Sequence, residues 1–275
     1  MEGDLRERLL AALAWQVELG ADEAIAEAPV DRFAAAVTPA PPAKPTPAAK
    51  TAPAPHGAML ARPASGAGDA AQAAREIAAA CDTLEALHAA LAAFEGCALK
   101  TGARRCVFSD GNPAARVMVI GEAPGREEDM AGKPFVGRSG KLLDRMLAAI
   151  GLDRTAEDPD HAVYVGNVVP WRPIENRTPS ADEIAVLLPF VRRQIALAAP
   201  EFVVLAGGTP AKALFGTETG ILRLRGEWRR LDDGPLALAT LHPAYLLRSP
   251  PAKRHAWRDL LALRAALDGE APALD

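Results

Sequence analysis

The sequence predicts an α/β domain with a central four-stranded parallel sheet and helices on both faces. Four short apolar runs, typical of strands buried on both sides, occupy residues 117–120, 162–165, 202–205 and 236–241. Stretches with helical periodicity separate these runs, and such alternation favours a three-layer parallel sheet. A hydrophobic content of 49% in 275 residues is enough to fill the core of this domain.

The expected helices follow from spacing and from residues that begin helices. After Ser139, apolar residues recur every three or four positions, which places them on one face of a helix. Ser180 is a candidate N-cap for the helix after the second strand. The expected helical ranges are residues 71–93, 139–150, 181–198, 210–215 and 252–267.

The chain is expected to have three parts. Residues 1–38 form an N-terminal helical arm, which is either loosely attached or binds a protein partner. Residues 39–70 are rich in Pro and Ala and predict a disordered linker, because such a stretch buries little apolar surface. Residues 71–268 form the α/β domain.

The net charge and the cysteines give evidence against several classes of protein. The net charge is −4, so a surface for nucleic acid would have to be a local basic patch. The three cysteines have no spacing typical of a zinc site or a disulfide framework. There is no secretion signal or apolar run of membrane-spanning length, so we expect a cytoplasmic monomer that binds no membrane.

Polar side chains follow three of the expected strands. Glu122 comes after the first strand, Asn167 after the second and His242 after the fourth. The carboxyl ends of parallel strands share one edge of the sheet, which is where ligands bind in open α/β folds. Phe135 lies between turn residues in the loop that follows the first strand. Each residue alone has an ordinary structural explanation, but together they indicate a functional site.

The loops around these residues resemble a known family. The phosphate-binding patterns G-x-G-x-x-G and G-x-x-x-x-G-K-[ST] are absent after the first strand. Instead the chain reads Gly-Glu-Ala-Pro-Gly from Gly121, then Gly-Lys-Pro-Phe-Val-Gly from Gly132. Further motifs are Asn-Val-Val from Asn167 and His-Pro-Ala-Tyr-Leu-Leu-Arg from His242. Over residues 94–262 the chain resembles the family 4 uracil-DNA glycosylases.

The resemblance implies the uracil-DNA glycosylase-like fold and hydrolysis of the N-glycosidic bond of uracil in DNA, the first step of base excision repair. It implies that Glu122, Asn167 and His242 are catalytic and that Gly121, Phe135, Asn167 and His242 bind uracil. The chemistry of the side chains agrees, because an amide matches the neighbouring O4 acceptor and N3–H donor of a flipped uracil. An imidazole can donate to O2, and a carboxylate can orient water and stabilise a cationic sugar.

Uracil-containing DNA is the expected partner, and several arginines are candidates for phosphate contacts. These are Arg172, Arg177 and Arg248. The cations that follow at positions 253–258 are either an ordinary solvated helix face or further phosphate contacts.

The chain departs from the family in the ligands of its [4Fe–4S] cluster. The resemblance implies four cysteine ligands, and this chain retains only Cys97. Phe94, Trp171 and Leu187 occupy the other three positions. Iron–sulfur clusters need thiolate ligands, so we expect no cofactor and a small apolar core in its place.

Three functions remain open from the sequence. The first is an active uracil-DNA glycosylase without a cluster. The second is a catalytically weak protein of the same fold that recognises uracil-DNA or single-stranded DNA. The third is an unrelated nucleotide-binding Rossmann-like protein, which the missing phosphate-loop glycines disfavour.

Overall fold

The computed structural model describes residues 67–232 and 234–274. The expected helical arm (residues 1–38) and all but the last four residues of the expected linker (residues 39–70) lie outside these ranges. The first described helix begins at Ala67, slightly before the expected start of the domain at residue 71. None of the helices in the described ranges is long and apolar enough to cross a membrane.

The fold is α/β, as expected, with one mixed sheet between two helical layers. The strands are β1 (Ser109–Gly111), β2 (Val117–Gly121), β3 (Val163–Asn167), β4 (Phe202–Ala206), β5 (Trp228–Arg230) and β6 (Leu236–Thr240). The helices are α2 (Ala67–Ala79), α3 (Leu84–Ala93), α4 (Leu99–Gly102), α5 (Arg126–Ala131), α6 (Arg138–Ala148), α7 (Ala181–Ala198), α8 (Gly208–Phe215), α9 (Ile221–Leu224), α10 (Pro243–Arg248) and α11 (Lys253–Leu267). Two short 3₁₀ turns, Ile174–Asn176 and Pro250–Ala252, complete the described elements.

The sheet differs from the expected four strands. Its order is β1-β3-β2-β4-β6-β5, with parallel pairing between β3, β2, β4 and β6 and antiparallel pairing of β1 and β5 at the edges. Each edge strand has only three residues. Such short strands show no detectable alternation of apolar and polar residues, so the sequence pattern missed them.

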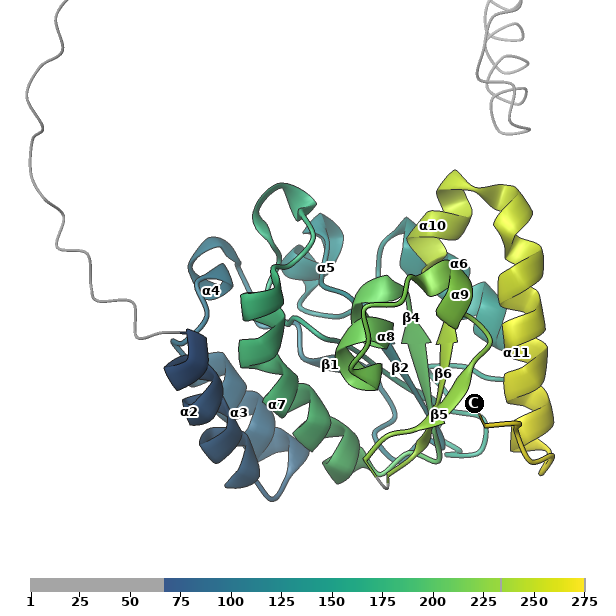
Figure 1. Cartoon of the computed structure of the whole chain (residues 1–275), viewed down its shortest axis with the longest axis horizontal. Coiled ribbons are helices and arrows are strands. Elements are labelled where there is room, and N and C mark those ends of the chain that lie inside the picture. The colour runs from purple at the N-terminus through teal and green to yellow at the C-terminus, as the bar shows by residue number, and fades with distance from the viewer. Residues whose placement is uncertain (1–66, 233, 275) are drawn as a thin grey trace, which may run out of the picture. The chain divides into compact units, whose positions relative to one another are not determined.

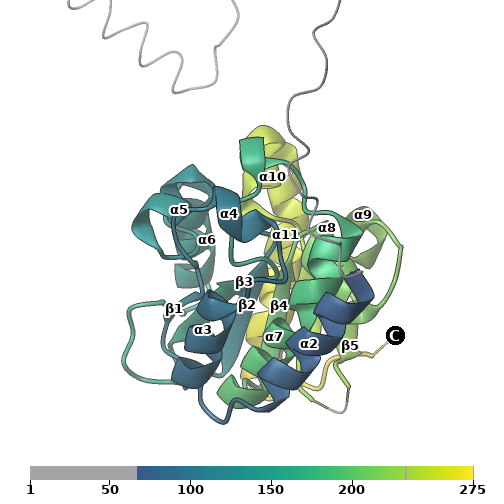
Figure 2. The same cartoon turned by 90° about the vertical axis from the view of Figure 1, so that its left-hand side faces the viewer.

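Side chains of the inner strands alternate between two separate cores. Val117 and Val119 of β2 face one side of the sheet, and Met118 and Ile120 face the other. The first side is covered by α6 and α11, and the second by α2, α3 and α7. Figures 1 and 2 show α2, α3 and α7 together on one side of the sheet and α11 on the opposite side.

The expected single helix over residues 71–93 is wrong, because two helices occupy this range. α2 ends at Ala79, and Thr83 begins α3 as an N-cap whose hydroxyl accepts a hydrogen bond from the Ala86 N–H. A Thr side chain at such a position competes with the helix backbone and favours a new start. Ser180 caps α7 as expected, through reciprocal bonds with Glu183.

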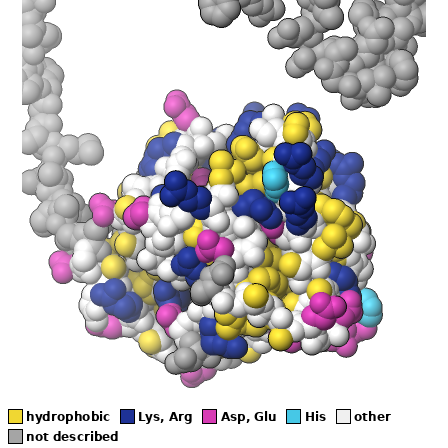
Figure 3. All heavy atoms as spheres, turned by 45° about the vertical axis from the view of Figure 1, so that its right-hand side comes forward, with side chains coloured by type: hydrophobic (Ala, Val, Ile, Leu, Met, Phe, Trp, Pro, Cys, Tyr) yellow, Lys and Arg dark blue, Asp and Glu magenta, His cyan; other side chains and the backbone are white. Residues whose placement is uncertain are grey.

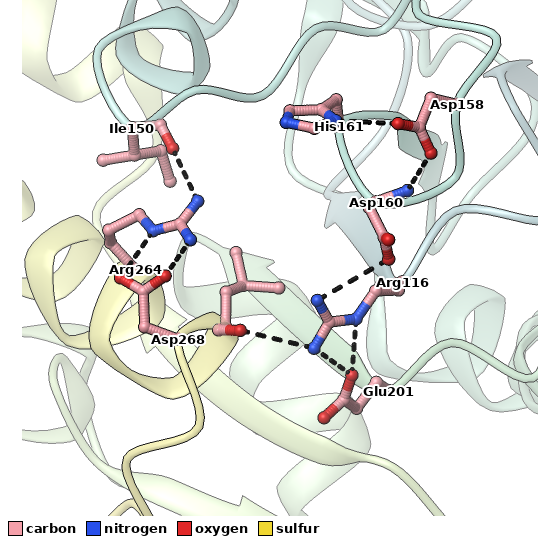
Figure 4. Close-up of polar contacts among 9 residues, drawn as sticks. Arg116, Ile150, Asp158, Asp160, His161, Glu201, Arg264 and Asp268 are labelled. Carbon is pink, nitrogen blue, oxygen red and sulfur yellow. Dashed lines mark hydrogen bonds and ion pairs between the residues drawn. The ribbon is translucent and has the colours of Figure 1, made fainter.

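A polar network ties the chain together at the amino ends of the inner strands (Figure 4). Arg116, just before β2, donates to Glu201, just before β4, at 2.7 Å, and to the Leu267 carbonyl at the end of α11. Arg264 of α11 pairs with Asp268. This end of the sheet is therefore closed by structural contacts, and the carboxyl ends of the strands are left for a site.

Candidate active site

A cavity of about 180 Å³ lies at the carboxyl ends of the strands. Phe135, Asn167 and His242 line it, together with Glu128, Ser139 and three small residues. They come from distant parts of the chain: Asn167 ends β3, His242 precedes α10, and Phe135 lies in the loop between α5 and α6. Three of the predicted site residues are thus brought to one cavity.

The backbone holds Phe135 in an unusual conformation. Its φ angle is +53°, in the left-handed region that costs a non-glycine residue of order 1–3 kcal/mol. Gly140 makes this possible, since a Cβ there would lie 1.8 Å from the Phe135 carbonyl oxygen. The ring is 5% exposed and lies 5.5 Å from the His242 ring, centroid to centroid. The strained loop therefore fixes an aromatic wall of the cavity.

Gly121 allows this wall and Asn167 to approach each other. It pairs with Asn167 at the ends of β2 and β3. A Cβ on Gly121 would lie 2.5 Å from both the Phe135 Cζ and the Asn167 Oδ1. The Asn167 side chain is buried, yet its amide borders the cavity, so it can bond to a ligand there.

His242 presents a neutral imidazole with a defined donor. Its Nδ1 accepts the Ala244 N–H at 3.1 Å as the N-cap of α10, which leaves the proton on Nε2. Burial, and then the charge of Arg248, lower the pKa of His242 to about 4. The ring is therefore uncharged near neutral pH and can donate one hydrogen bond from Nε2.

Glu128 organises the loop around the cavity and was not singled out from the sequence. Its buried carboxylate accepts N–H bonds from Gly125 at 3.1 Å, Val136 at 3.2 Å and Gly137 at 3.0 Å. The bond to Gly125 caps α5, and the other two hold the residues immediately before α6. An acid three residues after a glycine that ends a loop is a capping signal, and it could have identified Glu128.

Glu122 faces a second, neighbouring cavity. This open cavity of about 550 Å³ lies between α7 and α8. The Thr209 hydroxyl, at the start of α8, donates to Glu122 Oε2 at 2.5 Å. Glu122 itself does not line the smaller cavity, although the next residue, Ala123, does.

The three predicted phosphate contacts are in different settings. Arg248 is exposed and lines an open groove of about 510 Å³ with Arg126 and Arg138. This groove adjoins the smaller cavity, because both are lined by Glu128, Ser139 and Ala244.

Arg172 and Arg177 both form hydrogen bonds to other side chains of the protein. Arg172 donates to Asn176 Oδ1 at 2.8 Å. Arg177 binds both oxygens of Glu183, at 2.9 and 2.6 Å, and holds the pKa of that carboxyl down to about 2. Neither arginine lines the cavity or the arginine groove.

The positions of the family's cluster ligands belong to an apolar core. Phe94, Trp171 and Leu187 are 6%, 2% and 0% exposed and lie in the core beneath α2, α3 and α7. The Phe94 ring packs against Phe190 at 5.3 Å. Cys97 is buried in the same core. Cys81 and Cys106 also pack in this core, but the described residues contain no group of three His, Cys, Asp or Glu side chains that could hold a metal, so the residues present do not fit an iron–sulfur cluster.

Comparisons with known proteins agree on one family. The family model of the uracil DNA glycosylase superfamily matches residues 108–261. A type-4 uracil-DNA glycosylase of Sulfurisphaera tokodaii is 34% identical over 191 residues, covering 66% of this chain and 84% of that protein. One of Saccharolobus solfataricus is 35% identical over 70% of this chain and 91% of that protein. One of Thermotoga maritima is 39% identical over 56% of this chain and 77% of that protein.

Proposed function

This chain belongs to the uracil-DNA glycosylase superfamily, and we propose that it hydrolyses the N-glycosidic bond of uracil in DNA at the cavity lined by Phe135, Asn167 and His242. The observation that carries the proposal is that these side chains, contributed by three separate segments, meet at the carboxyl ends of the strands. An enzyme that acts on a base must hold that base outside the helix, in a pocket of this kind.

The pocket recognises uracil through two side chains. The Asn167 amide donates to O4 and accepts from N3–H, whereas cytosine presents the opposite pattern. The buried Phe135 ring forms an apolar wall for the base, and Gly121 leaves room for that wall beside Asn167. Because the strained Phe135 loop is held by Glu128, the pocket is formed before the base enters.

Bond cleavage places negative charge on the base and positive charge on the sugar. As the N1–C1′ bond breaks, its electron pair moves to the uracil ring, and the Nε2–H of His242 donates to O2, where that charge gathers. A neutral donor suits this task, since the pKa of His242 lies near 4 and the imidazole keeps its proton through the reaction. The Glu122 carboxylate stabilises the cationic sugar and accepts a proton from the water that adds to C1′.

Thr209 and the larger cavity assist Glu122. The hydroxyl of Thr209 donates a hydrogen bond to Oε2 of Glu122, which leaves Oε1 to bind water. The open cavity between α7 and α8 supplies a route for that water to reach the carboxylate.

Arg126, Arg138 and Arg248 bind the phosphates that flank the flipped nucleotide. Their groove adjoins the base cavity, and cations beside a base pocket position the DNA backbone. Arg172 and Arg177, which the sequence suggested for this role, bond to Asn176 and Glu183 and line neither the base cavity nor this groove.

We also propose that the chain carries no iron–sulfur cluster. The support is the apolar packing of Phe94, Trp171 and Leu187 where the family has thiolates. Metal analysis of protein isolated without oxygen should find iron at background level. Stoichiometric iron with the visible absorbance of a cluster would contradict the proposal.

The test of the activity is release of free uracil from single- and double-stranded oligonucleotides. Glu122→Gln and Asn167→Ala should each lower the rate by about 10²–10⁴-fold, the usual contribution of positioned catalytic groups. Glu218→Gln is the matched control for Glu122→Gln, because Glu218 is exposed and lines the same open cavity. Binding of uracil-DNA by the wild type without release would favour the recognition protein instead.

A further inference from the structure

A second surface lies beside the proposed DNA groove, where α6, α10 and α11 meet. It is a mostly apolar depression of about 230 Å³, whose lining includes Arg145, Met146, Leu246, Lys253 and Trp257. We call these five residues the Trp257 groove. The Trp257 side chain is 43% exposed, although tryptophan is usually among the most buried side chains. The mechanism of base removal does not use this indole.

The surroundings of the groove are basic. Arg145, Lys253, Arg254 and Arg258 are all exposed on α6 and α11. The acids on these two helices are paired elsewhere: Asp144 with Arg154, Asp259 with Arg225, and Asp268, just after α11, with Arg264. Figure 3 shows Lys and Arg side chains gathered around an exposed His, with hydrophobic side chains beside them. In a chain of net charge −4, this is a local basic patch, and such patches are the usual surface for a polyanion.

Two helices, α6 and α10, each contribute residues to both the groove and the base cavity. On α6, Ser139 lines the base cavity and Arg145 lines the Trp257 groove. Six residues of helix separate them, which is about 9 Å at 1.5 Å per residue. On α10, Ala244 lines the base cavity and Leu246 lines the groove. Stacked nucleotides rise about 3.4 Å each, so the groove lies within a few nucleotides of a flipped base.

We propose that the Trp257 groove binds the single-stranded flank of the uracil-containing strand, with an unpaired base stacked on Trp257 and phosphates against Arg145 and Lys253. This inference rests on the proposed function, because the flank is held beside a base in the cavity. Exposed aromatic rings among cations are the usual platform for single strands. In a duplex, neighbouring base pairs cover both faces of each base, so the indole selects unpaired DNA.

Binding of labelled, uracil-free single strands, followed by fluorescence anisotropy, tests the groove apart from catalysis. Trp257→Ala should weaken binding of a long strand by about tenfold, within the range for one stacked base. Trp257→Phe keeps an aromatic ring on which a base can stack, so its affinity for the strand should stay within about threefold of that of the wild type. Leu261→Ala is the matched control, since Leu261 is 47% exposed one turn along α11 and should leave binding unchanged.

Uracil release separates this inference from the proposed function. From an oligonucleotide too short to reach the groove, Trp257→Ala and the wild type should release uracil at equal rates. If the wild type releases none, the proposed function fails. If the wild type is active but Trp257→Ala binds long strands as well as the wild type does, only the groove proposal is overturned. Equal losses of binding in Leu261→Ala and Trp257→Ala would also overturn it, because the loss would then not depend on an aromatic ring.

Discussion

Replacing Gly121 with alanine should damage the base pocket while leaving the fold intact. The new Cβ would lie 2.5 Å from Phe135 Cζ and from Asn167 Oδ1, whereas ordinary contacts begin at 3.4 Å. The difference between 3.4 and 2.5 Å means that one or both side chains must retreat by about 0.9 Å. Phe135 has little freedom to do so, because its backbone is held against Gly140 and by the Glu128 bonds of its loop.

A misplacement of about 1 Å at a reacting centre lowers rates by about 10²-fold, and overpacking costs about 1–3 kcal/mol of stability. We therefore expect Gly121→Ala to remain folded, with a lower Tm, and to release uracil about 10²-fold more slowly. Gly220→Ala is the control, because a Cβ there meets nothing within 4 Å. Single-turnover release of uracil, measured beside thermal unfolding, is the assay. Activity of Gly121→Ala within about threefold of the control, far less than the loss expected for such a misplacement, would refute the pocket geometry.

Three further predictions concern the groups around the pocket. Because the folded-state pKa of His242 is near 4 and its ordinary value is 6.5, its neutral form adds stability above pH 6.5 that is lost as pH falls toward 4. The Tm of the wild type should thus fall more steeply over this range than that of His242→Asn. Thr209→Val should lower kcat about tenfold with little change in KM, since it removes a hydrogen bond to the charged Glu122, and Thr209→Ser should restore it. Glu128→Gln should lower both Tm and activity in unfolding and uracil-release assays, because one amide oxygen replaces a carboxylate that accepts three N–H bonds.

The sequence predicted the parts of the fold that have a clear hydrophobic pattern, either a continuous apolar run or apolar residues at helical spacing. The inner strands are continuous apolar runs because both of their faces are buried, and this pattern is visible without a structure. The edge strands β1 and β5 are three residues long and carry no such pattern. The break between α2 and α3 depends on a cap at Thr83, a local signal that an alanine-rich stretch conceals.

The candidate site likewise has features that the sequence predicted and features that it did not. Asn167 and His242 could be placed from the sequence because each lies at or just after the end of an apolar run that forms a buried strand. The contact between Thr209 and Glu122 could not, since it depends on how α8 packs beside the end of β2, 87 residues away in the chain. The ion pair between Arg177 and Glu183 could not be predicted either, because nothing in the sequence distinguishes these two residues from other surface charges. Phe135 was found by its motif, but its left-handed backbone is a property of its packing against Gly140.

The residues at the positions of the family's cluster ligands and the aromatic wall of the base cavity lie in different cores. Phe94, Trp171 and Leu187 pack beneath α2, α3 and α7, on one face of the sheet. Phe135 belongs to the core on the other face, with α6 and α11. A change of packing in the first core can reach the base pocket through Asn167, which lines a small cavity with Leu187, and through Ala123, which packs against that core and lines the base cavity. β2 holds the end of β3 through the pairing of Gly121 with Asn167, and β1 pairs with β3 up to Gly166, so both neighbouring strands support this part of the pocket.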